Sequence, residues 1–276
     1  MAAAEAFPQV ERLLSIMAKL RDPDSGCPWD LKQDFASIVP YTIEEAYEVA
    51  DAIENGSMDD VQDELGDLLF QVVFYAQLGK EQQHFDFEEI AKTVADKLVR
   101  RHPHVFESNT QPCLDELQQN WEHVKQQERA QKFAQQGTAK IDESILANIP
   151  KGMAPLVKAT KIQKKCAKVG FDWPDAEPVF DKVDEEIGEI KEAMQSPIEN
   201  QDHVEEEVGD LLFAVVNLAR HLGVDAETAL RKANYKFESR FRQVEKTVVA
   251  TGGSVQSSSL DQLESIWQQV KGKSTS

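Results

Sequence analysis

Apolar residues recur every three or four positions along most of the chain, which is the spacing of one face of an α-helix. In the first half this pattern predicts helices at residues 4–20, 42–54, from 57 onward, 87–101 and 114–132. In the second half it predicts helices at 156–168, 178–195, from 202 onward, 226–250 and a last one after residue 259. The alternating pattern of a half-buried strand is absent from the sequence, so we predict an all-α fold.

Polar residues at three of the predicted helix starts support this interpretation. Thr42 with Glu45, Ser57 with Asp60, and Asp202 with Glu205 have the three-residue spacing of a capping box, in which side chains satisfy the free amides of the first turn. We therefore expect a helix to begin at each of these positions.

A four-carboxylate pattern occurs twice. Glu45 and Glu48 precede Glu64 and Asp67 in the first half, and Glu186 and Glu189 precede Glu207 and Asp210 in the second. The repeat predicts two tandem helical modules of the antiparallel four-helix-bundle type. The Gln- and Lys-rich stretch between them, which also contains Gly and Pro, is typical of a boundary. We assign residues 1–132 and 156–276 to the modules and residues 133–155 to a linker.

The composition narrows the choice of partners. Thirty basic and forty-nine acidic residues give a net charge of −19, which argues against nucleic acid or an anionic membrane as a partner. Cys27, Cys113 and Cys166 are isolated, and we expect reduced thiols rather than disulfides or a zinc site. No apolar run has the length of a membrane span or a signal peptide, so we expect a cytoplasmic protein.

The spacing of the carboxylates predicts a metal site in each half. Glu189 and Glu207 each lie about six residues from the loop between their helices, and Glu48 and Glu64 flank the first-half turn in the same way. A solvated acidic face is the usual alternative for one Glu-rich helix, but a duplicated, matched pair of helices favours a cation. Oxygen ligands without His or Cys select Mg²⁺, with Mn²⁺ as an alternative.

Basic and aromatic residues repeat beside the carboxylates. Lys236 and Arg240 are four apart, as are Lys97 and Arg101, and each half ends with Trp-x-x-x-Lys, at Trp121 and Lys125 and at Trp267 and Lys271. Cations for phosphate oxygens and a ring for a base, together with bound Mg²⁺, predict a nucleoside polyphosphate site. Trp267 is either this base platform or a core residue. Trp29 and Trp173 are expected in the core.

Together with the carboxylate sets, three further motifs carry a family resemblance: Cys27-Pro28-Trp29-Asp30, Arg100-Arg101-His102-Pro103-His104 and Lys236-Phe237-Glu238-Ser239-Arg240. Over nearly its whole length the chain resembles the two-module bacterial MazG nucleoside triphosphate pyrophosphohydrolases. The resemblance implies an all-α bundle whose sites are built by two subunits, hence a homodimer. It also implies Mg²⁺-dependent hydrolysis of NTPs and dNTPs to nucleoside monophosphate and pyrophosphate, with broad base tolerance.

The resemblance further implies that the C-terminal module carries most of the activity. Its metal ligands would be Glu186, Glu189, Glu207 and Asp210, and its nucleotide contacts Asp210, Lys236, Arg240, Trp267 and Lys271. The residues themselves give a partial reason, because Lys182 and His203 stand where the first half has Tyr41 and Asp60. We add Lys182 and His203 to the nucleotide contacts. The first-half set is expected to be a weak second site or scaffold: Glu45, Glu48, Glu64, Asp67, Lys97, Arg101, Trp121 and Lys125.

The expected reaction is attack of a metal-activated water on phosphorus. Glu185 and Glu206 are adjacent to ligands and are the candidates for a general base or outer-shell acceptor. Two other hypotheses remain at this point: a regulatory protein that senses nucleotides without turnover, and a purely structural helical scaffold.

Overall fold

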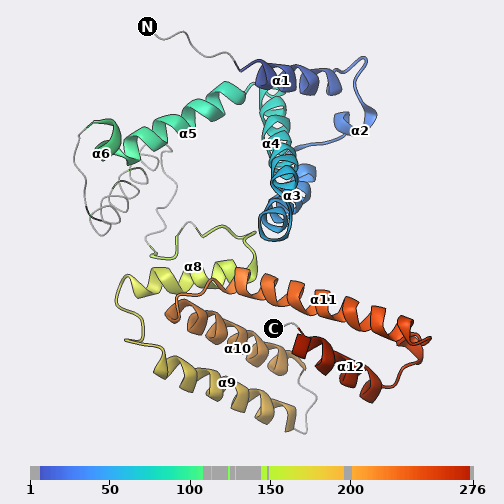
Figure 1. Cartoon of the computed structure of the whole chain (residues 1–276). Coiled ribbons are helices and arrows are strands. Elements are labelled where there is room, and N and C mark those ends of the chain that lie inside the picture. Colours follow the sequence, from blue (N-terminus) through green and yellow to red (C-terminus); the bar gives the residue numbers. More distant parts are fainter. Residues whose placement is uncertain are drawn as a thin grey trace. The chain divides into compact units, whose positions relative to one another are not determined.

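The computed structural model describes residues 7–107, 113, 124, 128, 144–147, 149–195 and 201–273, and every regular element among them is helical (Figure 1). The all-α prediction is therefore confirmed. The chain divides into two compact units, Met1–Ala139 and Lys140–Ser276. None of the described helices is both long and apolar enough to span a membrane.

The N-terminal unit is built around a helix hairpin. Its elements are α1 (Pro8–Leu20), α2 (Pro28–Leu31), α3 (Phe35–Asn55), α4 (Met58–Glu81), α5 (Phe87–Arg101) and α6 (Pro103–Phe106). The short turn after Asn55 makes α3 and α4 antiparallel, and the two helices pack along each other. Helix α1 packs against α4, and α5 leads away from the end of α4 (Figure 1).

The start of α3 differs from the prediction. The helix begins at Phe35, where the Asp34 side chain accepts a hydrogen bond from the Ser37 amide. The prediction that Thr42 caps this helix is wrong: its hydroxyl lies inside α3, 3.2 Å from the Ile38 carbonyl oxygen and 2.9 Å from the Tyr75 hydroxyl. The Ser57 cap of α4 is confirmed, since Ser57 and Asp60 form the reciprocal pair of a capping box.

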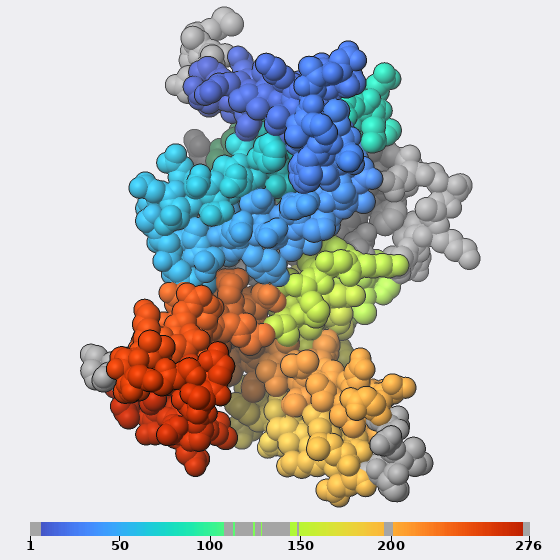
Figure 2. Space-filling view, turned by 90° about the vertical axis from the view of Figure 1, so that its right-hand side faces the viewer, coloured from blue at the N-terminus to red at the C-terminus, as the bar shows by residue number. Residues whose placement is uncertain are grey.

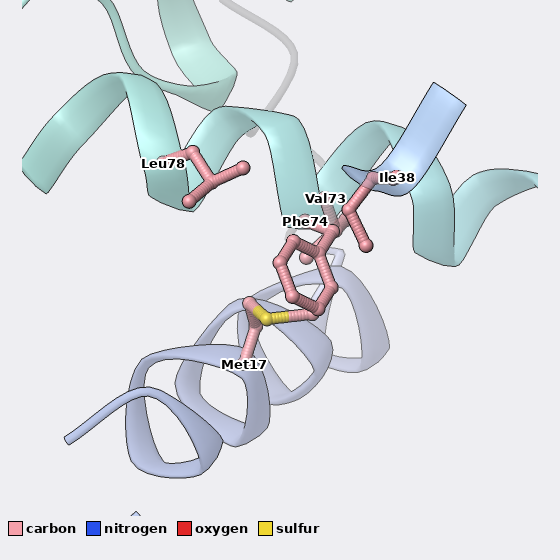
Figure 3. Packing of buried hydrophobic residues seen from close by; sticks show 5 residues of the cluster. All are labelled: Met17, Ile38, Val73, Phe74 and Leu78. Carbon is pink, nitrogen blue, oxygen red and sulfur yellow. The ribbon is translucent and has the colours of Figure 1, made fainter. Parts of the chain in front are cut away.

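Five buried side chains join three helices of this unit. Met17 of α1, Ile38 of α3 and Val73, Phe74 and Leu78 of α4 form one cluster, and none is more than 3% exposed. Figure 3 shows the Met17 side chain reaching the Phe74 ring. Burial of this size fixes α1 across the hairpin and so gives the hairpin a rigid support.

The C-terminal unit repeats the hairpin. Its elements are α8 (Pro155–Ala167), α9 (Glu177–Gln195), α10 (Gln201–His221), α11 (Ala226–Ala250), the 3₁₀ turn η1 (Val255–Ser257) and α12 (Leu260–Lys273). Helix α9 packs along α10, α8 packs on α10, and α11 packs on α12. Figure 2 shows the pairs α9–α10 and α11–α12 as two masses with a recess between them. Asp202 is the second residue of α10 rather than the residue that precedes the helix, so that prediction is wrong.

Two tryptophans expected in the core lie at the surface of the chain. Trp29 is 48% exposed and Trp173 is 41% exposed. Trp29 packs edge-on against Tyr41, with ring centroids 5.8 Å apart. Cys27 and Cys166 are partly buried and form no disulfide among the described residues.

Candidate metal and nucleotide site

Three carboxylates meet across the α9–α10 hairpin. Glu186 on α9 and Glu207 and Asp210 on α10 each offer an oxygen, and these oxygens lie within 4.8 Å of one another. Glu207 and Asp210 face the same way because they are one turn apart on α10. Like charges at this range repel, and a divalent cation would remove the repulsion.

Glu186 is the buried member of this group. Only 4% of the residue is exposed, and its Oε1 lies 2.8 Å from the Lys182 ammonium. Its Oε2 has no hydrogen-bond partner among the described residues. A buried carboxylate oxygen without a donor is costly, whereas a hard cation would satisfy it. The donor set therefore fits a divalent metal ion.

Basic side chains lie one turn before two of these carboxylates. Lys182 contacts both Glu185, at 2.9 Å, and Glu186. The hydrogen bonds to Glu186 and then Glu185 raise the pKa of Lys182 above its usual range, so this side chain is a permanent cation. His203 Nδ1 lies 3.3 Å from Glu207 Oε1 and 3.9 Å from Glu206.

Glu189 is the fourth predicted ligand of this half. It is outside the group of three whose oxygens meet, but its ionisation is affected by two members of that group. Desolvation, followed by repulsion from Glu186 and Glu207, raises its pKa. In the single chain, Glu189 therefore lies at the edge of the carboxylate cluster.

The N-terminal hairpin gathers a similar but different trio. Oxygens of Glu45, Glu48 and Glu64 lie within 4.8 Å of one another, and Asp67 is outside this group. The pKa of Glu45 is raised by desolvation and by the charges of Asp67 and Glu48. Desolvation, then Glu48 and Asp67, also raise the pKa of Glu64.

The neighbours of this trio differ from those of the C-terminal cluster. Tyr41 stands at the position of Lys182 and packs against the Trp29 ring. Asp60 stands at the position of His203 and is used as a helix cap. Gln71, which sequence analysis did not single out, donates from Nε2 to Glu45 Oε1 at 3.2 Å.

The predicted nucleotide contacts of the second half lie on α11 and α12. Lys236 and Arg240 are one turn apart on α11. The Trp267 ring packs against Phe237, with centroids 5.0 Å apart, and against the Val244, Val248 and Val270 cluster. Trp267 therefore has a core contact, but it is not fully buried. Lys271 follows one turn later on α12.

The corresponding first-half residues are less available. Arg101 pairs with Glu128 at 2.6 Å, and Arg100 pairs with the same carboxylate at 2.6 Å. The hydrogen bond from Arg101 is the main reason that the pKa of Glu128 is lowered to about 2. Lys97 lies on α5. Trp121 and Lys125 are outside the described residues.

The sequence pattern did not predict a role for Gln71 or Glu128. Gln71 had a signal, because it is a polar residue inside the apolar stripe of α4, two turns after Glu64. Glu128 had none, since nothing in the spacing links it to the arginines of α5.

Comparisons with known proteins agree with the geometry of the two hairpins. Residues 33–106 and 177–245 match the MazG nucleotide pyrophosphohydrolase domain. The chain is 53% identical to a nucleoside triphosphate pyrophosphohydrolase of Escherichia coli K12, over 95% of this chain and 97% of the relative. It is 43% identical to the nucleoside triphosphate pyrophosphohydrolase/pyrophosphatase MazG of Thermotoga maritima, over 95% of each. A crystal structure of a mazG-related protein from Thermotoga maritima, 27% identical, matches 42% of this chain and 98% of its own with a TM-score of 0.37.

Proposed function

The chain belongs to the MazG nucleotide pyrophosphohydrolase family, and from this premise we propose that its C-terminal hairpin is the site where it hydrolyses nucleoside triphosphates. The products would be nucleoside monophosphate and pyrophosphate, and both NTPs and dNTPs would be accepted with broad base tolerance. The observation that carries the assignment to this hairpin is Glu186 Oε2, a buried acceptor with no donor in the described part of the chain.

The proposed metal ligands are Glu186, Glu189, Glu207 and Asp210. Three of them already bring oxygens together, and Glu189 lies at their edge. An all-oxygen set favours Mg²⁺, and Mn²⁺ fits the same donors. The bound ion would neutralise phosphate charge and lower the pKa of a water.

The remaining roles fall to the chain's own side chains. Lys182 is a permanent cation one-third exposed at the rim of the cluster, so it suits a phosphate oxygen. Lys236 and Arg240, one turn apart on α11, would hold further phosphate oxygens, with His203, Asp210 and Lys271 as additional contacts. Trp267 would support the base. Stacking on the Trp267 ring would explain broad base tolerance, because every base has a face that can stack.

Two exposed carboxylates are candidates for accepting a proton from the attacking water. The side chain of Glu185 is 56% exposed and that of Glu206 is 73% exposed. Each is held by a basic residue one turn before it, Lys182 or His203. We assign them the role of general base or outer-shell acceptor.

We also propose that two copies of the chain complete the site as a homodimer. Both hairpins leave apolar side chains uncovered in the single chain: Leu212 is 53% exposed on α10, and Leu65 is 49% exposed on α4. A second hairpin would bury these faces and complete a four-helix bundle. Light scattering coupled to gel filtration tests this. We infer a cytoplasmic location from the isolated cysteines of the sequence.

Pyrophosphate release from each NTP and dNTP, measured with Mg²⁺ and with Mn²⁺, tests the proposal. Glu186→Gln should lower kcat/KM more than about a hundredfold, because even the outer-shell partners of metal ligands are worth about 10–100-fold. Glu45→Gln, the matched change in the other hairpin, should have little effect. Equal losses in the two variants would contradict the assignment to the C-terminal hairpin, and a larger loss in Glu45→Gln would reverse it. Binding of nucleotide without turnover would favour a nucleotide sensor.

A further inference from the structure

The two arginines at the end of α5 already hold an anion that belongs to the chain itself. Arg100 donates to Glu128 Oε1 from Nε at 2.9 Å and from Nη2 at 2.6 Å. Arg101 donates from Nη2 to Glu128 Oε2 at 2.6 Å, and from Nε to Oε1 at 3.4 Å. Guanidinium groups therefore bind both carboxylate oxygens of Glu128, in the fork arrangement that arginine also uses for phosphate.

This ion-pair cluster has little contact with water. The side chains of Arg101 and Glu128 are 20% and 13% exposed, so solvent screens their attraction only weakly. The hydrogen bond from Arg101 is the main cause that lowers the pKa of Glu128 to about 2. The carboxylate is therefore charged at neutral pH and stays paired with the arginines.

The surroundings of the cluster offer no surplus of positive charge. Asp96 and Glu107 line a recess of about 420 Å³ beside Arg100 and Glu128. Even without Asp96, which pairs with a lysine of its own, the other two carboxylates offset both guanidinium charges. A phosphate that approached the arginines would also lie close to the Glu128 carboxylate, and repulsion between like charges would oppose it.

The second half of the sequence has no acid at the equivalent position. Counted from the Trp-x-x-x-Lys motif of each half, the residue that corresponds to Glu128 is Ser274, which carries no charge. Arg101 and Arg240 are equivalent by the spacing of their own motif. The two modules thus have matching arginines, but only the first has a carboxylate at this place to neutralise its arginine.

We propose that Glu128 is an internal anion that occupies Arg101 and prevents the N-terminal module from binding the phosphates of a nucleotide there. The contact is autoinhibitory, because the carboxylate takes the place on Arg101 that a phosphate would take on Arg240. The inference rests on the proposed function, since it assumes that the two arginines are equivalent phosphate contacts. It gives a physical reason for unequal nucleotide binding by two modules with the same basic spacing.

The test measures binding of inorganic tripolyphosphate to the full-length chain by isothermal titration calorimetry, without a divalent metal. A Lys236→Met/Arg240→Met chain lacks the main proposed phosphate contacts of the second half and is the starting point. Adding Glu128→Gln should tighten tripolyphosphate binding at least about tenfold, because a like charge is removed from the contact. A further Arg101→Met should abolish the gain. Unchanged affinity in the Glu128→Gln variant would overturn the inference.

Glu107→Gln is the matched control in the same starting chain. It removes the same charge from the same recess but leaves the Glu128 ion pairs in place, so it should change the affinity much less. Equal tightening by the two variants would assign the effect to overall charge and refute the role of Glu128.

A second measurement needs no change at Glu128 and so does not depend on the folding of that variant. In the Lys236→Met/Arg240→Met chain, Arg101→Met alone should leave tripolyphosphate binding unchanged, because Arg101 is already paired. Weaker binding would show that Arg101 accepts phosphate despite Glu128 and would overturn the inference. If the unmodified chain released pyrophosphate while Glu128→Gln changed nothing, only this inference would fail. If it released none, the proposed function would fail as well.

Discussion

Arg21 is the side chain whose removal should most weaken the N-terminal unit electrostatically. The Arg21 side chain is 7% exposed, and its guanidinium donates hydrogen bonds to both carboxylate oxygens of Glu81 on α4, at 2.8 and 2.6 Å. It also donates to the Gln33 carbonyl oxygen at 3.2 Å and to that of Asp30, and lies 5.4 Å from the centre of the Phe74 ring. One residue therefore ties α1, the loop before α3, and α4 together.

The cost of Arg21→Met follows from the exposure of its partners. Breaking a buried ion pair by removing one member costs about 3–5 kcal/mol. Because 33% of the Glu81 side chain is exposed and can be rehydrated, we expect about 3 kcal/mol, the low end of that range. Lys92→Met is the matched control. In its pair with Asp96 the two side chains are 70% and 58% exposed, so loss of this pair should leave the stability almost unchanged.

Hydrogen exchange followed by mass spectrometry reads the two units separately. Amides of α1 and α4 should exchange about a hundredfold faster in Arg21→Met, since each 1.4 kcal/mol is about tenfold, while those of α11 stay unchanged. Equal exchange in Arg21→Met and Lys92→Met would refute the reasoning.

The same pair makes a prediction about pH. The hydrogen bond from Arg21 is the main cause that lowers the pKa of Glu81 from its usual 4.5. A carboxylate with a lowered folded-state pKa contributes stability above its unfolded pKa and loses it as the pH falls through the folded value. The stability difference between the parent and Arg21→Met should therefore be full at neutral pH and shrink below about pH 4.5. A difference that stayed constant into acid would contradict the assignment.

Two further predictions separate packing from function. Trp267→Ala should raise KM for NTPs by an amount equivalent to about 1–3 kcal/mol of base stacking. The control Val270→Ala, in the same cluster and 6% exposed, should lower only the unfolding temperature. Equal KM values in the two variants would show that Trp267 is only a core residue. Gly79→Ala should destabilise the chain by about 1–3 kcal/mol despite the better helix propensity of Ala, because the added Cβ would lie 2.5 Å from the Phe85 ring. Gly272→Ala should not destabilise it, because a Cβ there would meet nothing within 4 Å among the described residues. Thermal unfolding of the two variants makes the comparison.

The helices themselves could be predicted because their apolar period is strong. The bounds of α5 and α11 agree with the predicted ranges, and the Ser57 cap was identified from its spacing alone. The start of α3 could not be predicted in the same way. The Thr42 and Glu45 spacing imitates a capping box, whereas α3 begins earlier and contains Pro40 six residues after the Asp34 cap, although proline removes a helix hydrogen bond.

For the site, too, features set by local spacing could be predicted, whereas features set by tertiary packing could not. Spacing along two helices and a short turn is enough to predict that the carboxylates converge. It does not determine which oxygens meet, and the trio in each hairpin takes a different fourth residue as the outlier, Glu189 or Asp67. The pairing of Arg101 with Glu128, 27 residues later, depends on tertiary packing and has no local signature.

Glycines at matched positions indicate where the single chain is incomplete. Gly66 and Gly209 each lie in a helix between two of the predicted ligands, where glycine costs about 1 kcal/mol relative to alanine. Apart from the helix's own backbone, a Cβ added to either would meet nothing within 4 Å among the described residues. Their space is therefore not needed by the chain's own packing. A close approach from outside, by a bound nucleotide or by a second hairpin on the exposed face of α10, would use it. This is the surface that the proposed homodimer covers, so the same absence of a side chain would serve the assembly and the site together.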